Sequence, residues 1–255
     1  MFDLTGKVAV ITGSTKGIGK AIAEAMAKAG AKVVVSSRKA DACDAVAAEI
    51  NAAVGDGAGS ATAIPGNISH KEQLQALVDE TRKRLGQIDI LVCNAAVNPY
   101  FGGMADIPDD AFDKIMASNI RSNHWLCQMV LPEMKARKDG VIIIVSSIGG
   151  LKGTPVLGAY GISKAADMAL ARNIAVEYGP YNIRANAIAP GLIKTDFARA
   201  LWENPEILKQ ATSKAPLRRI GTPEEIAGAA VFMASDAGAF MTGHTMVIDG
   251  GATIT

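Results

Sequence analysis

The chain has 255 residues, of which 49% are hydrophobic and 20% are charged, and its 26 Lys and Arg against 25 Asp and Glu give a formal net charge of +1. This composition is ordinary for a soluble globular protein and excludes an intrinsically disordered chain, which needs low hydrophobicity and high net charge. With so little net charge, no global field steers the chain to nucleic acid or to an anionic membrane, so neither is expected as a partner.

Short β-branched runs recur along the chain and predict strands. The strongest are nearly continuous in apolar character, which is typical of strands buried on both faces of a parallel sheet covered by helices. They span 8–12, 33–35, 88–92, 141–145 and 246–248. Weaker runs at 60–64 and 183–188 predict two further strands.

Stretches rich in Ala, Glu and Lys lie between the strands and predict helices over 17–29, 39–54, 70–85, 109–136, 159–179 and 223–235. Two of them begin with capping signals: Ser69 precedes Glu72 in a capping box, and Thr222 precedes a proline at the first helical position and a second capping box. Strands that alternate with helices predict a doubly wound α/β fold. Because no linker or break in composition interrupts the pattern, we expect a single domain over 1–255.

A glycine-rich loop joins the first strand to the first helix. It reads Thr12-Gly13-Ser14-Thr15-Lys16-Gly17-Ile18-Gly19. Glycines in such a loop allow a tight turn, a close backbone approach to a pyrophosphate and close packing of helix on strand, and the helix N-terminus offers free N–H groups and a positive dipole. Its place between the first strand and the first helix predicts dinucleotide binding. The alternative is a flexible glycine turn.

The residues after the second strand bear on which dinucleotide is bound. An acid about 20 residues beyond the glycine loop would bind a ribose 2′-hydroxyl, whereas an Arg accommodates a 2′-phosphate. The run is Ser36-Ser37-Arg38-Lys39, with no acid before Asp41. Arg38 can grip a phosphate through two hydrogen bonds, Ser37 can donate to it, and Lys16 adds a second positive charge. We therefore expect NADP(H) rather than NAD(H), although two solvated surface cations would show the same pattern.

Ser147, Tyr160 and Lys164 predict a catalytic group. Tyr160 and Lys164 stand four residues apart and share one helix face, and Ser147 follows the fifth strand, at the edge where open α/β sheets bind ligands. A tyrosine is a poor acid–base group at neutral pH, but a neighbouring cation favours its phenolate, and a serine hydroxyl can hydrogen-bond a carbonyl oxygen. The set predicts protonation of a carbonyl oxygen while hydride arrives from the cofactor. The alternative is an amphipathic helix that happens to carry a tyrosine.

In these motifs the sequence resembles the short-chain dehydrogenase/reductase family, over essentially all 255 residues. The motifs are Thr12-Gly13-x3-Gly17-Ile18-Gly19, Asn94-Ala95-Ala96, Asn119, Ser147 with Tyr160-x3-Lys164, and Pro190-Gly191-x3-Thr195. The resemblance implies a Rossmann-like fold with a seven-stranded parallel sheet, helices on both faces, and a homotetramer. It also implies that Tyr160 is the acid/base and Ser147 positions the substrate. Lys164 would support the phenolate and bind the nicotinamide ribose, and Asn119 would hold a water in a proton relay through Lys164.

The same resemblance implies further cofactor contacts. Asn94 would steady the central sheet near the adenosine side, while Ile193 and Thr195 would contact the carboxamide region. Asn67 and Ile68 stand where the family usually has an Asp-Val pair that touches adenine, and Ala96 replaces a glycine. The full cofactor set is expected to be Gly13, Ser14, Thr15, Lys16, Gly17, Ile18, Gly19, Ser37, Arg38, Lys39, Asn67, Ile68, Asn94, Ala95, Ala96, Tyr160, Lys164, Pro190, Gly191, Ile193 and Thr195.

The substrate side is expected to be mostly apolar. Several of these motifs look like the NADP-dependent carbonyl/retinal reductase branch of the family, and in the family residues 192–215 form a mobile lid. We expect residues 99–103 and 148–157 to form other walls, with Ser147, Thr154, Phe197 and Trp202 in contact with the substrate. No Arg or Lys is obviously set to bind a carboxylate or a phosphate, which favours hydrophobic or aromatic ketones and dicarbonyls over sugar phosphates.

Two other functions stay open. The same active site would serve a 3-oxoacyl-thioester reductase, whose acyl carrier would need a basic patch such as Arg121 or Arg218 and Arg219. A catalytically idle dinucleotide sensor belongs to a different class. Such proteins typically lose the tyrosine or the lysine, and this sequence keeps both.

The remaining signals bear on compartment and metals. Cys43, Cys93 and Cys127 are odd in number and widely spaced, which indicates three thiols in a reducing compartment rather than disulfides. The histidines show no metal-binding spacing, so no metal is expected. No apolar run reaches the roughly 18 residues of a membrane span. The first residues lack the features of a signal peptide and the last lack a peroxisomal tripeptide, so we expect a cytoplasmic protein.

Overall fold

In the computed structural model of the chain, which describes residues 1–213 and 215–255, seven parallel strands form one sheet. Its order is β3-β2-β1-β4-β5-β6-β7. The strands are β1 (Val8–Thr12), β2 (Lys32–Ser36), β3 (Ser60–Ala63), β4 (Ile90–Cys93), β5 (Gly140–Val145), β6 (Ile183–Pro190) and β7 (Thr245–Ile248). The chain winds outward from β1 in one direction and from β4 in the other. The reversal of strand order between them opens a crevice at the carboxyl ends of the strands, where open α/β sheets bind ligands.

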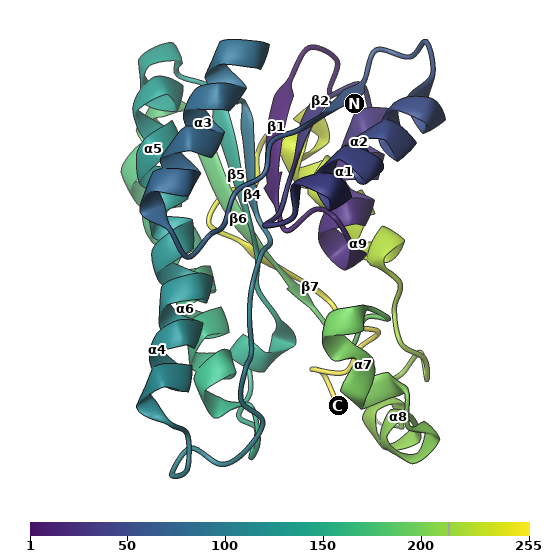
Figure 1. The fold of residues 1–255 in the computed structure, drawn as a ribbon. Helices are drawn as coiled ribbons and strands as arrows, with labels where there is room; N and C mark the ends of the chain where they lie inside the picture. The colour runs from purple at the N-terminus through teal and green to yellow at the C-terminus, as the bar shows by residue number, and fades with distance from the viewer. Residues whose placement is uncertain (214) are drawn as a thin grey trace.

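Helices cover both faces of the sheet (Figure 1). On one face lie α1 (Gly17–Lys28), α2 (Ala40–Val54) and α9 (Pro223–Ala234), and on the other α3 (Lys71–Leu85), α5 (Ser122–Arg137) and α6 (Gly158–Tyr178). The helix α4 (Asp109–Met116) runs into α5, while α7 (Arg199–Trp202) and α8 (Pro205–Thr212) lie beyond the end of the sheet. The predicted doubly wound, seven-stranded α/β fold is confirmed.

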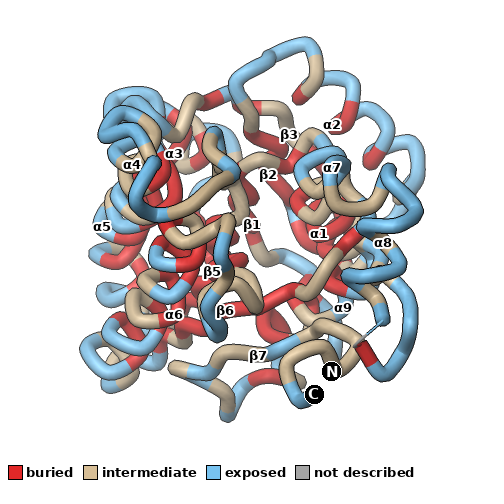
Figure 2. The backbone as a smooth tube through the Cα atoms, turned by 90° about the horizontal axis from the view of Figure 1, so that it is seen from below, coloured by how far each residue is buried: buried red, intermediate tan, exposed pale blue. Residues whose placement is uncertain are grey.

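Side chains of the central strands alternate between two apolar cores. Ile11 of β1 packs in the core that includes Ile22 of α1 and Ile226 of α9, whereas its neighbour Val10 joins Leu77 of α3 in the other core. Figure 2 shows the buried segments concentrated in the strands and on the inner sides of the helices. Since helices cover both faces, both sets of strand residues must be apolar, and this explains why continuous apolar runs marked the strands.

Two helix predictions need correction. The predicted helix over 109–136 is two helices joined by a π-helical turn, Ala117–Arg121. The capping box predicted at Ser69 is wrong: α3 begins at Lys71, because the side-chain oxygen of Asn67 accepts from the Ser69 N–H at 3.1 Å and forms a turn there instead. The cap predicted at Thr222 is confirmed, since Glu225 accepts from its backbone N–H at 2.8 Å.

The segment expected as a lid leaves the end of β6 and returns to α9. Its base is held by two backbone bonds, from Lys194 N to Gly221 O at 3.0 Å and from Gly221 N to Leu192 O at 2.9 Å. Beyond this base, α7 and α8 contain no buried residue. Lys214, within the expected lid, lies outside the described residues. Beyond α8, Ala215 is again buried.

Over residues 1–213 and 215–255, no helix combines the length and the apolarity needed to cross a membrane. The three cysteines are free and buried, as the spacing predicted.

Candidate active site

The glycine loop packs so closely against the segments after β4 and β6 that its glycines leave no room for a side chain. Gly13 and Gly17 adopt φ values of +66° and +56°, a region that favours glycine. A Cβ on Gly13 would lie 3.0 Å from Ala95 Cα, and one on Gly17 would lie 3.2 Å from the Thr195 methyl. A Cβ on Gly19 would collide with the Asn94 side-chain amide. The loop therefore packs closely between the segments that follow β4 and β6.

Asn94 and Thr12 tie the end of β4 to the glycine loop. The Thr12 hydroxyl accepts from the backbone N–H of Asn94 at 3.0 Å and from that of Ala95 at 3.1 Å. The Asn94 side-chain amide donates to Thr12 O at 2.8 Å and to Gly13 O at 3.2 Å. These bonds hold the ends of β1 and β4 together at the crevice.

Several expected cofactor residues use their polar side chains within the fold. The buried Ser14 hydroxyl donates to Ile11 O at 2.7 Å and accepts from Ser36 N at 2.9 Å. Ser37 Oγ lies 3.3 Å from the Cys43 sulfur, and Asn67 Oδ1 is engaged by Ser69 N. Because these side-chain groups already bond within the protein, we expect these residues to contact a ligand mainly through their backbone.

The two expected phosphate-binding cations differ in their surroundings. Lys16 Nζ lies 3.6 Å from Asp196, in the segment expected as a lid, and Asp196 also pairs with Arg199 at 2.6 Å. Arg38 is exposed just after β2 and has neither a hydrogen bond nor an ion pair with any residue that the structure describes. Lys39, next in sequence, is the N-cap of α2. Arg38 is thus available to an anion, while the charge of Lys16 is partly balanced.

Ser147, Tyr160 and Lys164 come together where β5 ends and α6 begins. Ser147 Oγ accepts from Gly149 N at 3.1 Å. A Cβ on Gly149 would lie 3.4 Å from Ser147 Oγ and 3.8 Å from the Tyr160 ring, so Gly149 lies close to both the hydroxyl and the ring. Lys164 Nζ lies 5.8 Å from the centroid of the Tyr160 ring. The predicted group therefore shares one end of the sheet.

Lys164 is only 2% exposed. Its ammonium donates to Val145 O and to Asp167 Oδ2, each at 2.9 Å. Burial alone would lower the pKa of Lys164, but the carboxylate of Asp167 and then Tyr160 outweigh it and raise that pKa above its ordinary value. Asp167 was missed from the sequence, where its position three residues after Lys164, on the same helix face, was the available signal.

Asn119 lies in the π-helical turn and is fully buried. Its side-chain oxygen accepts from Val97 N at 2.9 Å, and its amide donates to Val97 O at 3.1 Å and to Ser163 Oγ at 3.0 Å. Asn119 thus joins the loop after β4 to α6 one residue before Lys164. A π-helical turn of this kind often lies at a functional site.

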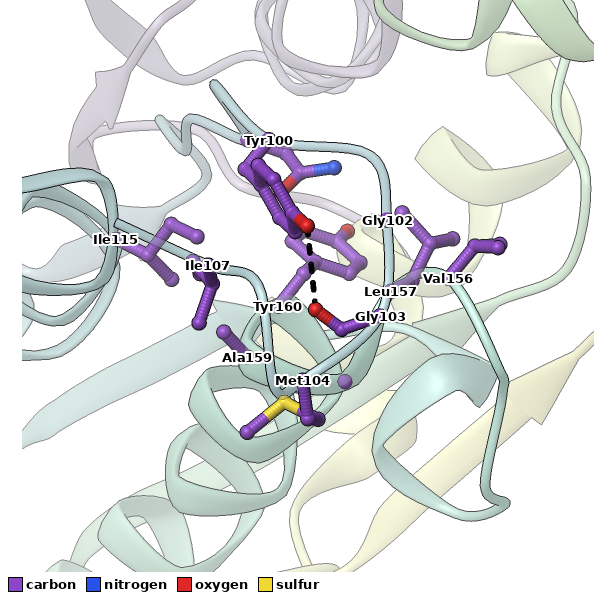
Figure 3. Close-up of a pocket in the computed structure, with 12 residues that line it drawn as sticks. Tyr100, Gly102, Gly103, Met104, Ile107, Ile115, Val156, Leu157, Ala159 and Tyr160 are labelled. Carbon is purple, nitrogen blue, oxygen red and sulfur yellow. Dashed lines mark hydrogen bonds between the residues drawn. The ribbon is translucent and has the colours of Figure 1, made fainter. Parts of the chain in front are cut away.

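A narrow pocket leads to Tyr160. Its walls are mostly apolar and come from Tyr100, Met104, Ile107, Ile115, Val156 and Leu157. Figure 3 shows Tyr100 and Tyr160 in this pocket, with the Tyr100 hydroxyl donating to Gly103 O at 3.2 Å. Asn98 also lines it, and its Oδ1 is buried without a hydrogen-bond partner among the described residues. The pocket offers one unused acceptor among apolar walls.

The four expected substrate residues differ in whether they lie near Tyr160. Phe197 lies in the segment expected as a lid, with its ring centroid 6.0 Å from that of Tyr160. Trp202 Nε1 instead donates to Thr195 O at 2.8 Å, within the same segment. Thr154 is not among the residues that line the pocket, and its hydroxyl accepts from Val156 N at 3.4 Å. Of the expected four, Phe197 has a ring contact with Tyr160, and Ser147 lies near Tyr160 beside Gly149.

The two expected wall segments do meet. Gly102 N donates to Val156 O at 3.0 Å, and Gly102 and Leu157 form a short parallel bridge. The expected walls did not include Asn98, Met104, Ile107 and Ile115, nor Gly158 and Ala159 at the start of α6. The first four reach the pocket because α4 and the long segment before it lie against α6, and no spacing in the sequence indicates that path.

Comparison with known proteins places the whole chain among dehydrogenases and reductases. A family model described as enoyl-(acyl carrier protein) reductase matches residues 13–253. Dehydrogenase/reductase SDR family member 4 from Bos taurus is 42% identical over 252 residues, covering 98% of this chain and 88% of that protein.

Two solved structures share the fold along its full length. A 7 alpha-hydroxysteroid dehydrogenase complexed with NADH and 7-oxo glycochenodeoxycholic acid matches with a TM-score of 0.92 at 39% identity, covering 98% of this chain and 95% of that one. A gluconate 5-dehydrogenase from Burkholderia cenocepacia J2315 in complex with NADP and tartrate matches with a TM-score of 0.94 at 31% identity, covering 100% of this chain and 98% of that one.

Proposed function

The chain belongs to the short-chain dehydrogenase/reductase family of oxidoreductases, and from this premise we propose that it interconverts a ketone or aldehyde with an alcohol, using NADP(H) and an apolar carbonyl substrate. One observation carries the proposal. Ser147, Tyr160 and Lys164 lie together where β5 ends and α6 begins, and Tyr160 lines a pocket with mostly apolar walls. A hydroxyl donor, a phenol and a buried cation in that order form an acid–base site for a carbonyl oxygen.

The residues around the glycine loop fit a dinucleotide. Side chains at Gly13, Gly17 and Gly19 would fill the space against β4 and the lid base, and α1 begins at Gly17 with backbone N–H groups that have no partner within the helix. The cofactor supplies hydride to the carbonyl carbon, or accepts it from the alcohol. Arg38 is exposed and has no partner among the described residues, which supports NADP(H) over NAD(H) because a guanidinium binds a 2′-phosphate strongly.

The protein's own residues would handle the oxygen and the proton. The Ser147 hydroxyl donates to the carbonyl oxygen and holds it against Tyr160. During reduction the Tyr160 phenol gives its proton to that oxygen, and the Lys164 ammonium stabilises the phenolate left behind. During oxidation the phenolate takes the proton from the alcohol. Asn119 would hold a water on the relay through Lys164, as the family resemblance implies.

Further parts of the proposal concern the substrate and the assembly. The apolar walls and Phe197 favour a hydrophobic or aromatic carbonyl compound, and the free oxygen of Asn98 favours one that also carries a hydrogen-bond donor. Residues 192–215 act as the lid of a single catalytic domain. We also propose a homotetramer, as the family resemblance implies. We place the protein in the cytoplasm.

The test is oxidation of NADPH and of NADH, in parallel, by the purified protein with a panel of carbonyl compounds. The panel holds a diketone, an aromatic ketone, a retinal-like aldehyde, a 3-oxoacyl thioester and a keto sugar. Turnover with NADPH that falls about 10²- to 10⁴-fold in Tyr160→Phe is expected, because that is the usual contribution of a general acid. Tyr178→Phe, on the same helix but away from the site, is the matched control and should retain turnover.

Each other outcome points to a different function. Preference for the thioester would favour the 3-oxoacyl reductase, although Arg219 of the candidate carrier patch already pairs with Glu225 at 2.6 Å. Tight cofactor binding without turnover on any compound, unchanged in Tyr160→Phe, would favour the dinucleotide sensor. Turnover with NADH alone would keep the mechanism and overturn the role given to Arg38.

A further inference from the structure

A buried carboxylate lies next to the Lys164 ammonium. Asp167 on α6 is 0% exposed, and its Oδ2 accepts from Lys164 Nζ at 2.9 Å. Its other oxygen, Oδ1, accepts from Asn123 Nδ2 at 2.9 Å, and the same amide nitrogen donates to Asn119 O at 2.6 Å. Hydrogen bonds therefore connect the ammonium, through Asp167 and Asn123, to the carbonyl of the π-helical turn.

Burying this ion pair costs folding free energy. A carboxylate and an ammonium lose their hydration on burial, and a buried ion pair is often no more stable than apolar residues of the same size. An ion pair at this depth is therefore better explained by what it does for the group it holds. Asp167 holds a lysine to which we have given a role in the reaction.

We propose that Asp167, supported by Asn123, is a positioning residue that fixes the Lys164 ammonium in its charged form beside the Tyr160 ring. The proposal rests on the proposed function, in which Lys164 stabilises the Tyr160 phenolate. Lys164 has three N–H donors, and Val145 O and Asp167 Oδ2 take two of them. The third donor is left for the side of the site where the tyrosine and the cofactor ribose would lie.

The helix geometry places the Asp167 carboxylate next to the Lys164 ammonium. Tyr160, Lys164 and Asp167 follow each other at spacings of four and three residues, so they form one column on the face of α6. The ammonium lies within this column, with the ring on one side and the carboxylate on the other. Asn123 comes from α5, and it fixes the carboxylate from outside the helix.

The ionisable groups around Lys164 come from three elements. On α6 they are Tyr160 and Asp167, and the thiols of Cys93 on β4 and Cys127 on α5 lie nearby. Contact with Cys127, together with burial, raises the pKa of Cys93 well above its ordinary value, so this thiol stays neutral. Burial raises the pKa of Asp167, while its bonds with Lys164 and Asn123 act in the opposite direction. Its carboxylate is the partner that opposes the loss of hydration at Lys164.

Removing the carboxylate should therefore make Lys164 lose its proton more easily. Without Asp167, burial remains and lowers the pKa of the ammonium. The charge would then disappear in the alkaline range, where alcohol oxidation depends on a stabilised phenolate. We therefore expect Asp167→Asn to lose alcohol oxidation activity at high pH, where the wild type keeps it.

The first experiment follows Lys164 itself and needs no substrate. Full-length protein labelled with ¹³C at the lysine ε-carbon is titrated by NMR, and Lys164→Arg identifies the resonance. In the wild type, Lys164 should titrate above the ordinary range of lysine, and in Asp167→Asn it should titrate below that range. Asn123→Ala, which keeps the carboxylate but removes its support, should shift the titration in the same direction by less. Identical titrations in the wild type and Asp167→Asn would overturn the proposal.

The second experiment is the pH profile of alcohol oxidation. In Asp167→Asn, kcat should fall about tenfold per pH unit above the new Lys164 transition, because one required proton is lost, while the wild type shows no such fall. Asp167→Glu should restore part of the alkaline activity. Asp89→Asn is the control: Asp89 is also buried, at 2% exposed, and accepts from Val8 N at 2.8 Å, far from Lys164. It should lower stability without changing the shape of the profile.

The two proposals fail in different ways. If the wild type shows no turnover with any compound, the proposed function fails, and the NMR titration still tests the role of Asp167. If the wild type turns over, Tyr160→Phe does not, and the pH profile of Asp167→Asn only drops in height, then Asp167 is merely structural and the inference alone is wrong.

Discussion

Replacing Arg38 with Asp would test the assignment of the 2′-phosphate site. Arg38 follows β2 directly, is exposed, and makes no hydrogen bond or ion pair within the part of the chain that the structure describes. Its guanidinium therefore gives up no partner on binding a phosphate. Lys16 is different, because its ammonium already lies 3.6 Å from Asp196.

These surroundings set the expected magnitudes. A hydrogen bond to a charged group contributes about 1.5–3 kcal/mol, and about 1.4 kcal/mol corresponds to a factor of ten in affinity. Arg38→Asp should therefore weaken NADPH binding roughly 10- to 140-fold. NADH lacks the phosphate, so its affinity should change little or rise. Lys16→Ala should cost at most about 1 kcal/mol, roughly fivefold, because exposed ion pairs contribute little.

The assay is the Kd of each dinucleotide by titration calorimetry, at one fixed ionic strength because exposed charges are screened by salt. Lys28→Asp is the matched control, since Lys28 is an exposed cation at the opposite end of α1. An NADPH Kd in Arg38→Asp within about threefold of the wild type would refute the reasoning, because even one charged hydrogen bond is worth more than that.

Three further predictions concern stability. Gly19→Ala would force a Cβ into the glycine loop and should cost about 1–3 kcal/mol of unfolding free energy; in a denaturant titration, Gly228→Ala, with open space around it, should cost nothing. Ile143→Ala, at a 0% exposed position in β5, should lower the unfolding free energy by about 2–5 kcal/mol, and a smaller loss would mean that the core collapses around the gap. Glu225 accepts hydrogen bonds from Arg219 and Thr222 N, which lower its pKa to about 2. Its contribution to stability is therefore present above its ordinary pKa and lost as the pH falls towards about 2. The thermal midpoint of Glu225→Gln should be less sensitive to pH over that window, and parallel curves would contradict this.

The fold was predictable because its signals are local. A strand covered on both faces must be apolar at every position, and this left continuous runs that do not depend on the rest of the chain. The weak runs at 60–64 and 183–188 also proved to be strands, since alternation with helices required parallel neighbours. The cap at Ser69 failed because two local signals competed and the turn at Asn67 prevailed. The π-helical turn left no mark in the sequence, because the contacts of Asn119 with Val97 and Ser163 lie far from it along the chain.

The doubly wound fold, the glycine loop and the grouping of Ser147, Tyr160 and Lys164 could be read from the sequence, because each depends on spacing within one or two elements. Which polar groups are free and which are engaged depends on how distant segments pack together. Among the described residues this packing leaves Arg38 without a partner, and the Thr154 hydroxyl accepts from Val156 N. The packing also buries Asp167 against Lys164, with Asn123 brought from α5. The spacing along α6 set these two charges three residues apart, but the loss of water that couples them comes from the sheet and the helices packed around α6.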